Sequence, residues 1–133
     1  MQDSEEYGYS VTLEEGYDEA VTRSRLALRA EGFSIITEAH VGDVFDSGAE
    51  HGRQYLIMSA WAAPVEDRAL GSDLQVAVHL PCNFVVQEMG TSALVAALDP
   101  AEGLEERNGA QARAATEARE ALGRVFARIV AQP

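Results

Sequence analysis

The sequence predicts an α+β fold, a two-layer sandwich of order β-α-β-β-β-β-α. In it, a mostly antiparallel five-stranded sheet carries two long helices on one face. Apolar residues recur at helical spacing in two long segments, 17–31 and 110–130, while five shorter segments alternate or are continuously apolar between turn residues. The chain has 133 residues, of which 47% are hydrophobic, so it is long enough for a single domain with its own core over residues 1–133.

The first half of the chain supplies one predicted helix and three predicted strands. Strand-like alternation covers residues 7–13, and helical periodicity from Tyr17 ends at Gly32, a residue typical of a helix C-terminus. The helix should bury one face, made of Tyr17, Ala20, Val21, Ser24, Leu28 and Glu31. The second predicted strand, 33–41, places Phe33, Ile35, Thr37, Ala39 and Val41 on one side and Ser34, Ile36, Glu38 and His40 on the other. A polar loop, 42–52, with a helical turn near 44–45 leads to a third strand, 53–62.

The second half supplies a hairpin and the second long helix. Pro64 suits the first turn of a short helix, 64–70. Strands are predicted over 83–89 and 92–98, and Gly90-Thr91 forms the tight turn between them. The final helix, about 110–130, carries an apolar stripe of Ala114, Ala118, Leu122, Val125, Phe126 and Ile129, and its Glu120 and Arg124 have the spacing of a stabilising pair. Residues 1–6 should form a flexible N-terminus.

The charge of the chain argues against nucleic acid and membrane partners. There are 22 acidic residues against ten basic ones, all of them Arg, so the formal net charge is −12. A phosphate backbone or an anionic bilayer would be repelled by this field. One cysteine forms no internal disulfide, and the acidic start of the chain has no apolar signal core, so the expected location is cytoplasmic.

Several stretches of the sequence resemble one family. They are Tyr7–Val11, Tyr17–Val21, Glu31–Phe33, Thr37–Glu38, Pro64 with Ala69–Leu70, Leu80–Val86 and Ala96–Pro100. In this order they resemble DUF302, a bacterial and archaeal family of unknown function, and Leu80-Pro81-Cys82-Asn83 is the most specific part. The resemblance implies a fold similar to the TATA-binding-protein-like architecture and a homodimer, and it implies no established activity. Ala60-Trp61-Ala62-Ala63-Pro64 departs from the Cys-Asn-Pro that relatives usually have here, so a role that needs a second cysteine is not supported.

Cys82 is the first candidate for chemistry. A reactive thiol needs a nearby cation or a helix N-terminus, and the sequence has no Arg between Arg68 and Arg107. Cys82 also shares its phase with Phe84 and Val86, which predicts a buried side chain. His79 and Cys82 have an H-x-x-C spacing, but a metal site would need His40 or His51 to complete it.

No catalytic residue, metal ligand or cofactor is predicted. Glu88 shares its phase with Cys82, although one carboxylate and one thiol do not make a mechanism. The chain contains no G-x-S-x-G, P-loop or G-x-G-x-x-G sequence. Two hypotheses follow: a non-enzymatic homodimer with a small-ligand pocket, or a thiol- or metal-dependent protein of sulfur or redox metabolism that uses Cys82 with His79 or His40.

The third and fifth strands favour the first hypothesis, because both are apolar on both sides. In the third, Tyr55, Ile57 and Trp61 oppose Leu56, Met58 and Ala60; in the fifth, Leu94, Ala96 and Leu98 oppose Ala93, Val95 and Ala97. With both long helices on one face, the other face should be covered by a second subunit, a small apolar ligand or the segment 64–70. The candidate ligand-binding residues are His40, Trp61, His79, Cys82, Asn83 and Glu88.

Overall fold

The computed structural model of the protein describes residues 8–42, 54–62, 82–98 and 109–131. Within them the chain forms five strands and two helices. These are β1 (Gly8–Leu13), α1 (Tyr17–Ala30), β2 (Phe33–Val41), β3 (Tyr55–Ala62), β4 (Cys82–Met89), β5 (Ser92–Leu98) and α4 (Gly109–Ala131). No helix in these ranges is long and apolar enough to cross a membrane.

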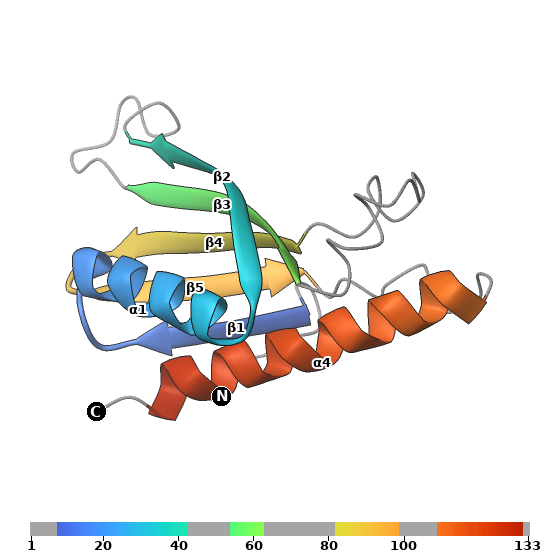
Figure 1. Ribbon diagram of the computed structural model, residues 1–133. Coiled ribbons are helices and arrows are strands. Elements are labelled where there is room, and N and C mark those ends of the chain that lie inside the picture. The colour runs from blue at the N-terminus through green and yellow to red at the C-terminus, as the bar shows by residue number, and fades with distance from the viewer. Residues whose placement is uncertain (1–7, 43–53, 63–81, 99–108, 132–133) are drawn as a thin grey trace.

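The strands form one open sheet in the order β1-β5-β4-β3-β2, and every neighbouring pair is antiparallel. Strands β2 to β5 follow one another as a meander, while β1 pairs with β5 at the far edge. Helix α1 therefore belongs to the connection that leads from β1 at one edge of the sheet to β2 at the other, and α4 lies beside α1 on the same face (Figure 1). This confirms the predicted α+β fold with both long helices on one side.

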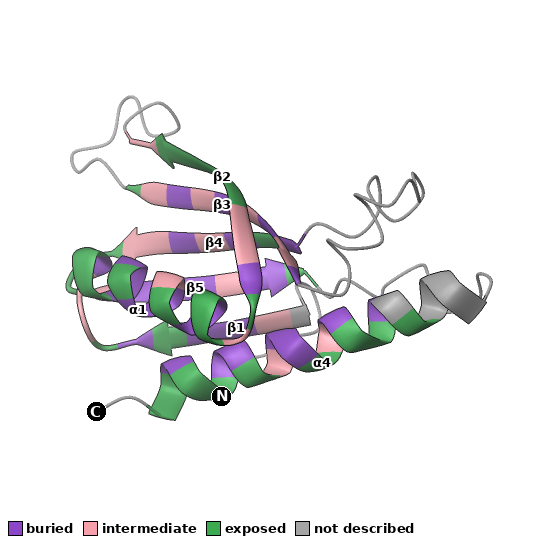
Figure 2. Ribbon diagram, viewed as in Figure 1, coloured by how far each residue is buried: buried purple, intermediate pink, exposed green. Residues whose placement is uncertain are grey.

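The core lies between the helices and the sheet (Figure 2). Its largest fully enclosed side chains come from both layers, namely Phe84, Leu28, Leu56, Met58, Leu122 and Ile129. Phe126 of α4 stacks on Tyr9 with ring centroids 5.3 Å apart and lies 5.4 Å from Phe84. The predicted helix faces are confirmed for Ala20, Val21, Ser24 and Leu28 and for the described part of the α4 stripe.

The predicted strands and helices have nearly the observed ends. β3 begins at Tyr55 rather than 53, β4 begins one residue earlier than predicted, and α4 extends one residue further at each end. Gly32 and Gly90 have φ angles of 85° and 67°, which fits a helix end and a hairpin turn where side chains are disfavoured. The predictions for residues 1–6, 44–45 and 64–70 lie outside the described residues.

The predicted faces of β2 are wrong beyond Ile35. A β-bulge between Ile35 and Thr37 adds one residue and reverses the alternation. Phe33 and Ile35 therefore face the helices, whereas Thr37 and the following odd-numbered residues face the other side. Consequently Glu38 and His40 lie on the helix side of the sheet, with Met58 and Leu56 as their neighbours on β3.

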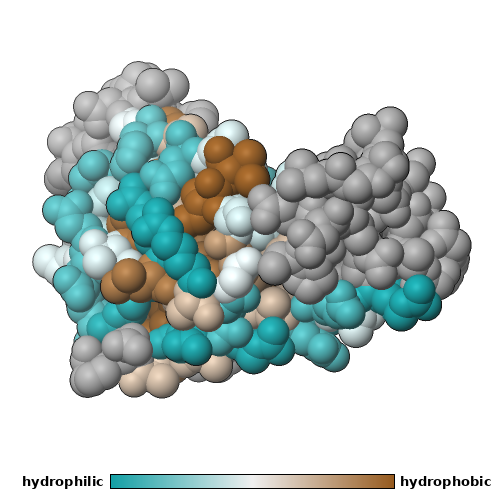
Figure 3. Space-filling view, viewed as in Figure 1, coloured by the Kyte–Doolittle hydropathy of each residue, from teal (hydrophilic) through white to brown (hydrophobic). Residues whose placement is uncertain are grey.

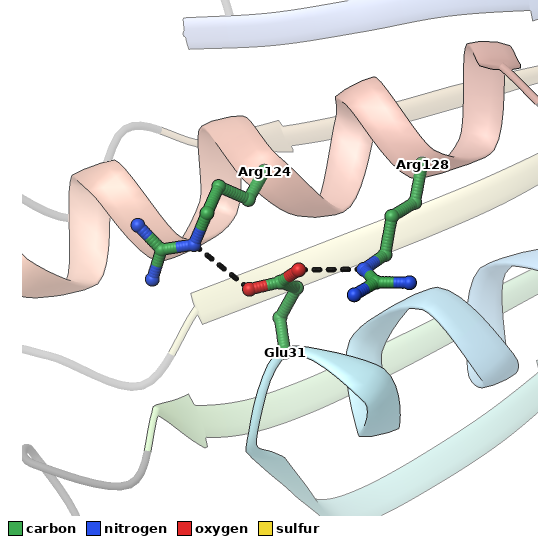
Figure 4. Close-up of polar contacts among 3 residues, drawn as sticks. All are labelled: Glu31, Arg124 and Arg128. Atoms are coloured by element: carbon green, nitrogen blue, oxygen red, sulfur yellow. Dashed lines mark hydrogen bonds and ion pairs between the residues drawn. The ribbon is translucent and has the colours of Figure 1, made fainter.

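Ion pairs connect the two helices at the margin of the helix layer. Glu31, at the end of α1, accepts hydrogen bonds from Arg124 Nε at 2.8 Å and Arg128 Nε at 2.5 Å on α4 (Figure 4). These bonds, first from Arg128 and then from Arg124, lower the pKa of the Glu31 carboxyl. Arg124, predicted to pair with Glu120, instead joins the two helices.

Two further arginines of α1 connect it to its surroundings. Arg23 Nη1 donates to the carbonyl oxygen of Ile129, 106 residues later in the chain, at 3.2 Å, while Nη2 donates to Glu15 Oε2 at 2.8 Å. Arg25 donates two hydrogen bonds, of 2.9 and 2.7 Å, to the carboxylate of Glu38 on β2. These bonds lower the pKa of Glu38 and raise the pKa of Arg25. In the view of Figure 3, hydrophilic side chains dominate the described surface along both helices, interrupted by smaller apolar areas.

Candidate functional site

The face of the sheet opposite the helices is called the open face here. Because side chains alternate along each strand and partners in register share a face, its residues form transverse rows. The middle rows are Thr37–Ser59–Asn83–Leu98, Ala39–Ile57–Val85–Ala96–Ser10 and Val41–Tyr55–Gln87–Leu94–Thr12. Ser34 and Trp61 form the row before them. Most of these side chains are half-buried, and Leu98 is 47% exposed.

No described residue of the open face is charged, although the whole chain has a net charge of −12. Its polar groups are hydroxyls and amides, and Ser59 Oγ donates to Asn83 Oδ1 at 3.1 Å. In contrast, the helix side of the same strands carries Glu38, His40 and Glu88. The open face is therefore the neutral, largely apolar surface that the two-sided pattern of β3 and β5 predicts.

A dent of about 250 Å³ lies on the open face between β4 and β5. Its lining comprises Asn83, Val85, Gln87, Leu94, Ala96, Ala97 and Leu98. Ala96 is small and stands between two leucines on the same face, so the surface is hollow at Ala96 and raised at Leu94 and Leu98. Among these residues only Asn83 was a predicted ligand-binding residue, although the sequence had placed Leu94, Ala96 and Leu98 on one side of the fifth strand. The Leu-x-Ala-x-Leu pattern of β5 indicates a small residue between two larger ones, but the β4 side chains that complete the dent are known only from the strand pairing.

Trp61 stands at the end of β3, also on the open face. Its indole nitrogen Nε1 is shielded from solvent and has no hydrogen-bond partner among the residues that the structure describes. A buried indole N–H usually has one, because an unpaired buried donor costs free energy. On the open face, the indole N–H of Trp61 is therefore a buried donor for which a hydrogen-bond acceptor would be stabilising.

Cys82 lies on the other side of the sheet. Its side chain is 1% exposed and belongs to the core, which confirms the predicted inward phase. The following residue, Asn83, is exposed on the open face. The sheet thus separates these two neighbouring candidate residues.

His40 shares the helix side with Cys82 but lies far from it. Cys82 is in register with Ala60 of β3 and His40 with Leu56, so four residues along the strand and two strand spacings separate them. This places the two Cα atoms about 16 Å apart. A thiol–imidazole pair or a shared metal ion needs contact distances, so these two residues do not form one site.

Glu88 ends β4 on the helix side. Its Oε1 accepts a hydrogen bond from Gln54 N at 3.1 Å, and its backbone N–H donates to the Gln54 carbonyl at 2.8 Å. Glu88 also contributes to the raised pKa of Tyr17, for which burial is the first cause and Asp18 the second. Glu88 therefore extends the pairing of β3 and β4 by its contacts with the Gln54 backbone.

The described residues contain no group of three or more His, Cys, Asp or Glu side chains placed to hold a metal ion. His79, the remaining candidate, lies outside the residues that the structure describes. The candidates therefore divide into an open-face set, Trp61 and Asn83, and a helix-side set, Cys82, His40 and Glu88.

Comparison with known families settles the relationship that the sequence suggested. The profile of the family described as "Domain of unknown function DUF302" matches residues 9–129. The chain belongs to the DUF302 family. This match includes α1 and β2 to β5 in full, and it omits only Gly8 of β1 and the last two residues of α4.

A solved structure agrees on the fold of the DUF302 domain. It is the crystal structure of an uncharacterized conserved DUF302 protein from Bacillus stearothermophilus, with a TM-score of 0.73 and 21% sequence identity. The alignment covers 91% of this chain and 96% of that one. No curated protein matches the sequence.

Proposed function

We propose that this DUF302 domain is a non-enzymatic binding protein that works as a homodimer, with the open face as its binding surface. The observation that carries the proposal is the absence of charge from the described open face of a protein with a net charge of −12. Charged residues are depleted at the centres of protein interfaces, and large apolar faces are seldom left bare on monomers. The proposed setting is the cytoplasm, without nucleic acid or membrane partners.

The dent over Ala96 supports an alternative occupant of the open face, a small apolar ligand, where no side chain of a second copy fills it. Its floor is apolar, and the Asn83 and Gln87 amides at its margin offer hydrogen bonds. This combination of apolar walls and a few polar groups is typical of small-molecule sites. Trp61 and Asn83, which lie on the open face, remain the proposed ligand-binding residues. Of the other candidates, Cys82, His79 and His40 belong to the competing hypothesis, and Glu88 lies on the helix side.

The competing hypothesis is a thiol- or metal-dependent protein that uses Cys82 with His79 or His40. The burial of Cys82 and its separation from His40 weigh against it. Alkylation separates the two hypotheses: Cys82 should react only after unfolding. Rapid alkylation of the folded protein, or a stoichiometric metal ion in the purified protein, would favour the thiol or metal role.

Sedimentation velocity and native mass spectrometry test the proposal itself. The expected result is a dimer at micromolar concentration, with or without a bound small molecule. A monomer at all concentrations that carries no small molecule would refute the proposed function.

A further inference from the structure

The open face has two neighbouring features of opposite shape. Leu98 projects from β5 with 47% of its surface exposed, and Ala96, two residues earlier on the same face, lies in the dent. A raised and a hollow position side by side are self-complementary when a second copy is turned by 180°, because each copy then offers its projection to the hollow of the other.

We propose that a second copy of this chain packs on the open face, sheet against sheet, with Leu98 of each copy seated in the Ala96 dent of its partner. This inference rests on the proposed homodimer and specifies how its two copies meet. The two-fold axis lies between the sheets and crosses β5 near Ala97. Stacked sheets in proteins pack about 10 Å apart with strands nearly aligned, which is compatible with this arrangement.

The charge distribution favours the open face, over the other described surfaces, as the contact between two copies. Two chains of net charge −12 repel one another, so they associate best where neither brings carboxylates to the contact. The described open face meets this requirement. The groove between α1 and α4, about 360 Å³ in volume, does not, because Glu19, Arg23 and Arg128 line it together with the exposed Leu26.

The size of the face is adequate. Five strands about 4.8 Å apart and eight residues long, as in β3, cover on the order of 600 Å². Specific interfaces bury about 600–1,000 Å² on each partner. The open face alone therefore reaches the lower end of this range.

The same axis offers Trp61 a partner. The two-fold axis runs across the strands, between the row that contains Asn83 and the row that contains Val85. It therefore exchanges the row of Tyr55 with the row of Trp61, so Tyr55 of one copy lies over Trp61 of the other. A phenolic oxygen such as that of Tyr55 can accept a hydrogen bond, and the shielded Trp61 N–H has no acceptor in the described part of its own chain. This second contact is independent of the leucine and the dent.

Disulfide trapping tests the arrangement. Ala96→Cys chains mixed with Leu98→Cys chains under mild oxidation should give covalent dimer at least tenfold faster than Leu26→Cys chains, the matched control on α1, where Leu26 is 61% exposed. The native Cys82 is buried and does not compete. Equal trapping in the control would show random collision and overturn the proposal.

A second measurement uses Leu98→Asp, with Leu26→Asp as its control. Leu98→Asp should weaken dimerisation at least a hundredfold and shift the emission of Trp61, the single tryptophan, while Leu26→Asp leaves both unchanged. A Leu98→Asp protein that remains dimeric would place the interface elsewhere, which overturns this inference and leaves the proposed homodimer standing. A monomer with a small molecule seated at Ala96 would also overturn it but retain the proposed binding function.

Discussion

The two sides of one sheet differ in composition although the same strands build both. On β4, Phe84 and Val86 are completely buried, while the alternating residues Asn83 and Val85 face the open side and remain accessible. Charged side chains gather at the margin of the helix side and are missing from the described open face. The helix side is thus buried by helices of its own chain, whereas the described open face carries the neutral, largely apolar side chains on which the proposed dimer rests.

The largest expected difference between the sides is in stability. Leu56→Ala should lower the free energy of unfolding by about 3 kcal/mol, since Leu56 is fully buried and its loss leaves a cavity. Ile57→Ala, the adjacent open-face change, should cost about 1 kcal/mol when measured on monomer. Chemical denaturation at low protein concentration gives both values, and equal losses would show that one chain buries the two sides alike.

Arg23 tests whether the charges of the helix side are structural. Arg23→Met should lower the free energy of unfolding by about 2 kcal/mol, because the guanidinium serves both Ile129 and Glu15 from a buried position. Arg29→Met, an exposed change on the same helix, is the matched control for thermal or chemical denaturation. If the two substitutions cost the same, Arg23 does not hold the end of α4.

The salt dependence of dimerisation tests whether the interface is uncharged. Raising NaCl from about 0.02 M to about 0.5 M should strengthen dimerisation several-fold, because screening reduces the repulsion between two chains of net charge −12 while an uncharged interface loses nothing. Dissociation constants from sedimentation at several salt concentrations measure this. Weaker association at high salt would mean that ion pairs hold the interface, which the open face does not provide.

The smallest expected effect concerns the pH dependence of the Glu31 bridge between the helices. Its pKa is lowered from the ordinary 4.5, so its stabilising contribution is complete above that value and is lost as pH falls through the lower folded pKa. Glu31→Gln should therefore be less stable than the natural protein at neutral pH and equal to it in acid. Denaturation midpoints across pH, with Glu120→Gln as the control for charge, would contradict this if the difference persisted at low pH.

Much of the fold was predictable because alternation and helical periodicity are local. They gave the order of the elements, the Gly90 turn and the inward phase of Cys82. The faces of His40 and Glu38 were not predictable, since one added residue at Ile36 reverses the phase and nothing in the sequence signals such a bulge. Arg124 likewise has a plausible partner one turn away, and only the packing of the helices offers it Glu31 instead.

The sequence predicted the apolar character of the candidate site but not which residues come together in it. The two-sided apolar pattern of β3 and β5 indicated an uncovered face, and Trp61 and Asn83 do lie on it. Cys82 lies on the opposite side, as its phase predicted, whereas the side of His40 depends on the β2 bulge and its separation from Cys82 on the strand register, which the sequence does not show. The hollow at Ala96 depends on the neighbouring β4 side chains, so it too appears only in the folded sheet.

Sedimentation equilibrium of two matched isoleucine variants tests the central claim most directly. Ile57 lies in the middle of the open face, while Ile36, 46% exposed, belongs to the β2 bulge. The account predicts that Ile57→Asp is a folded monomer, by circular dichroism and mass, under conditions where the natural protein and Ile36→Asp are dimers. A dimer that survives Ile57→Asp unchanged would contradict it.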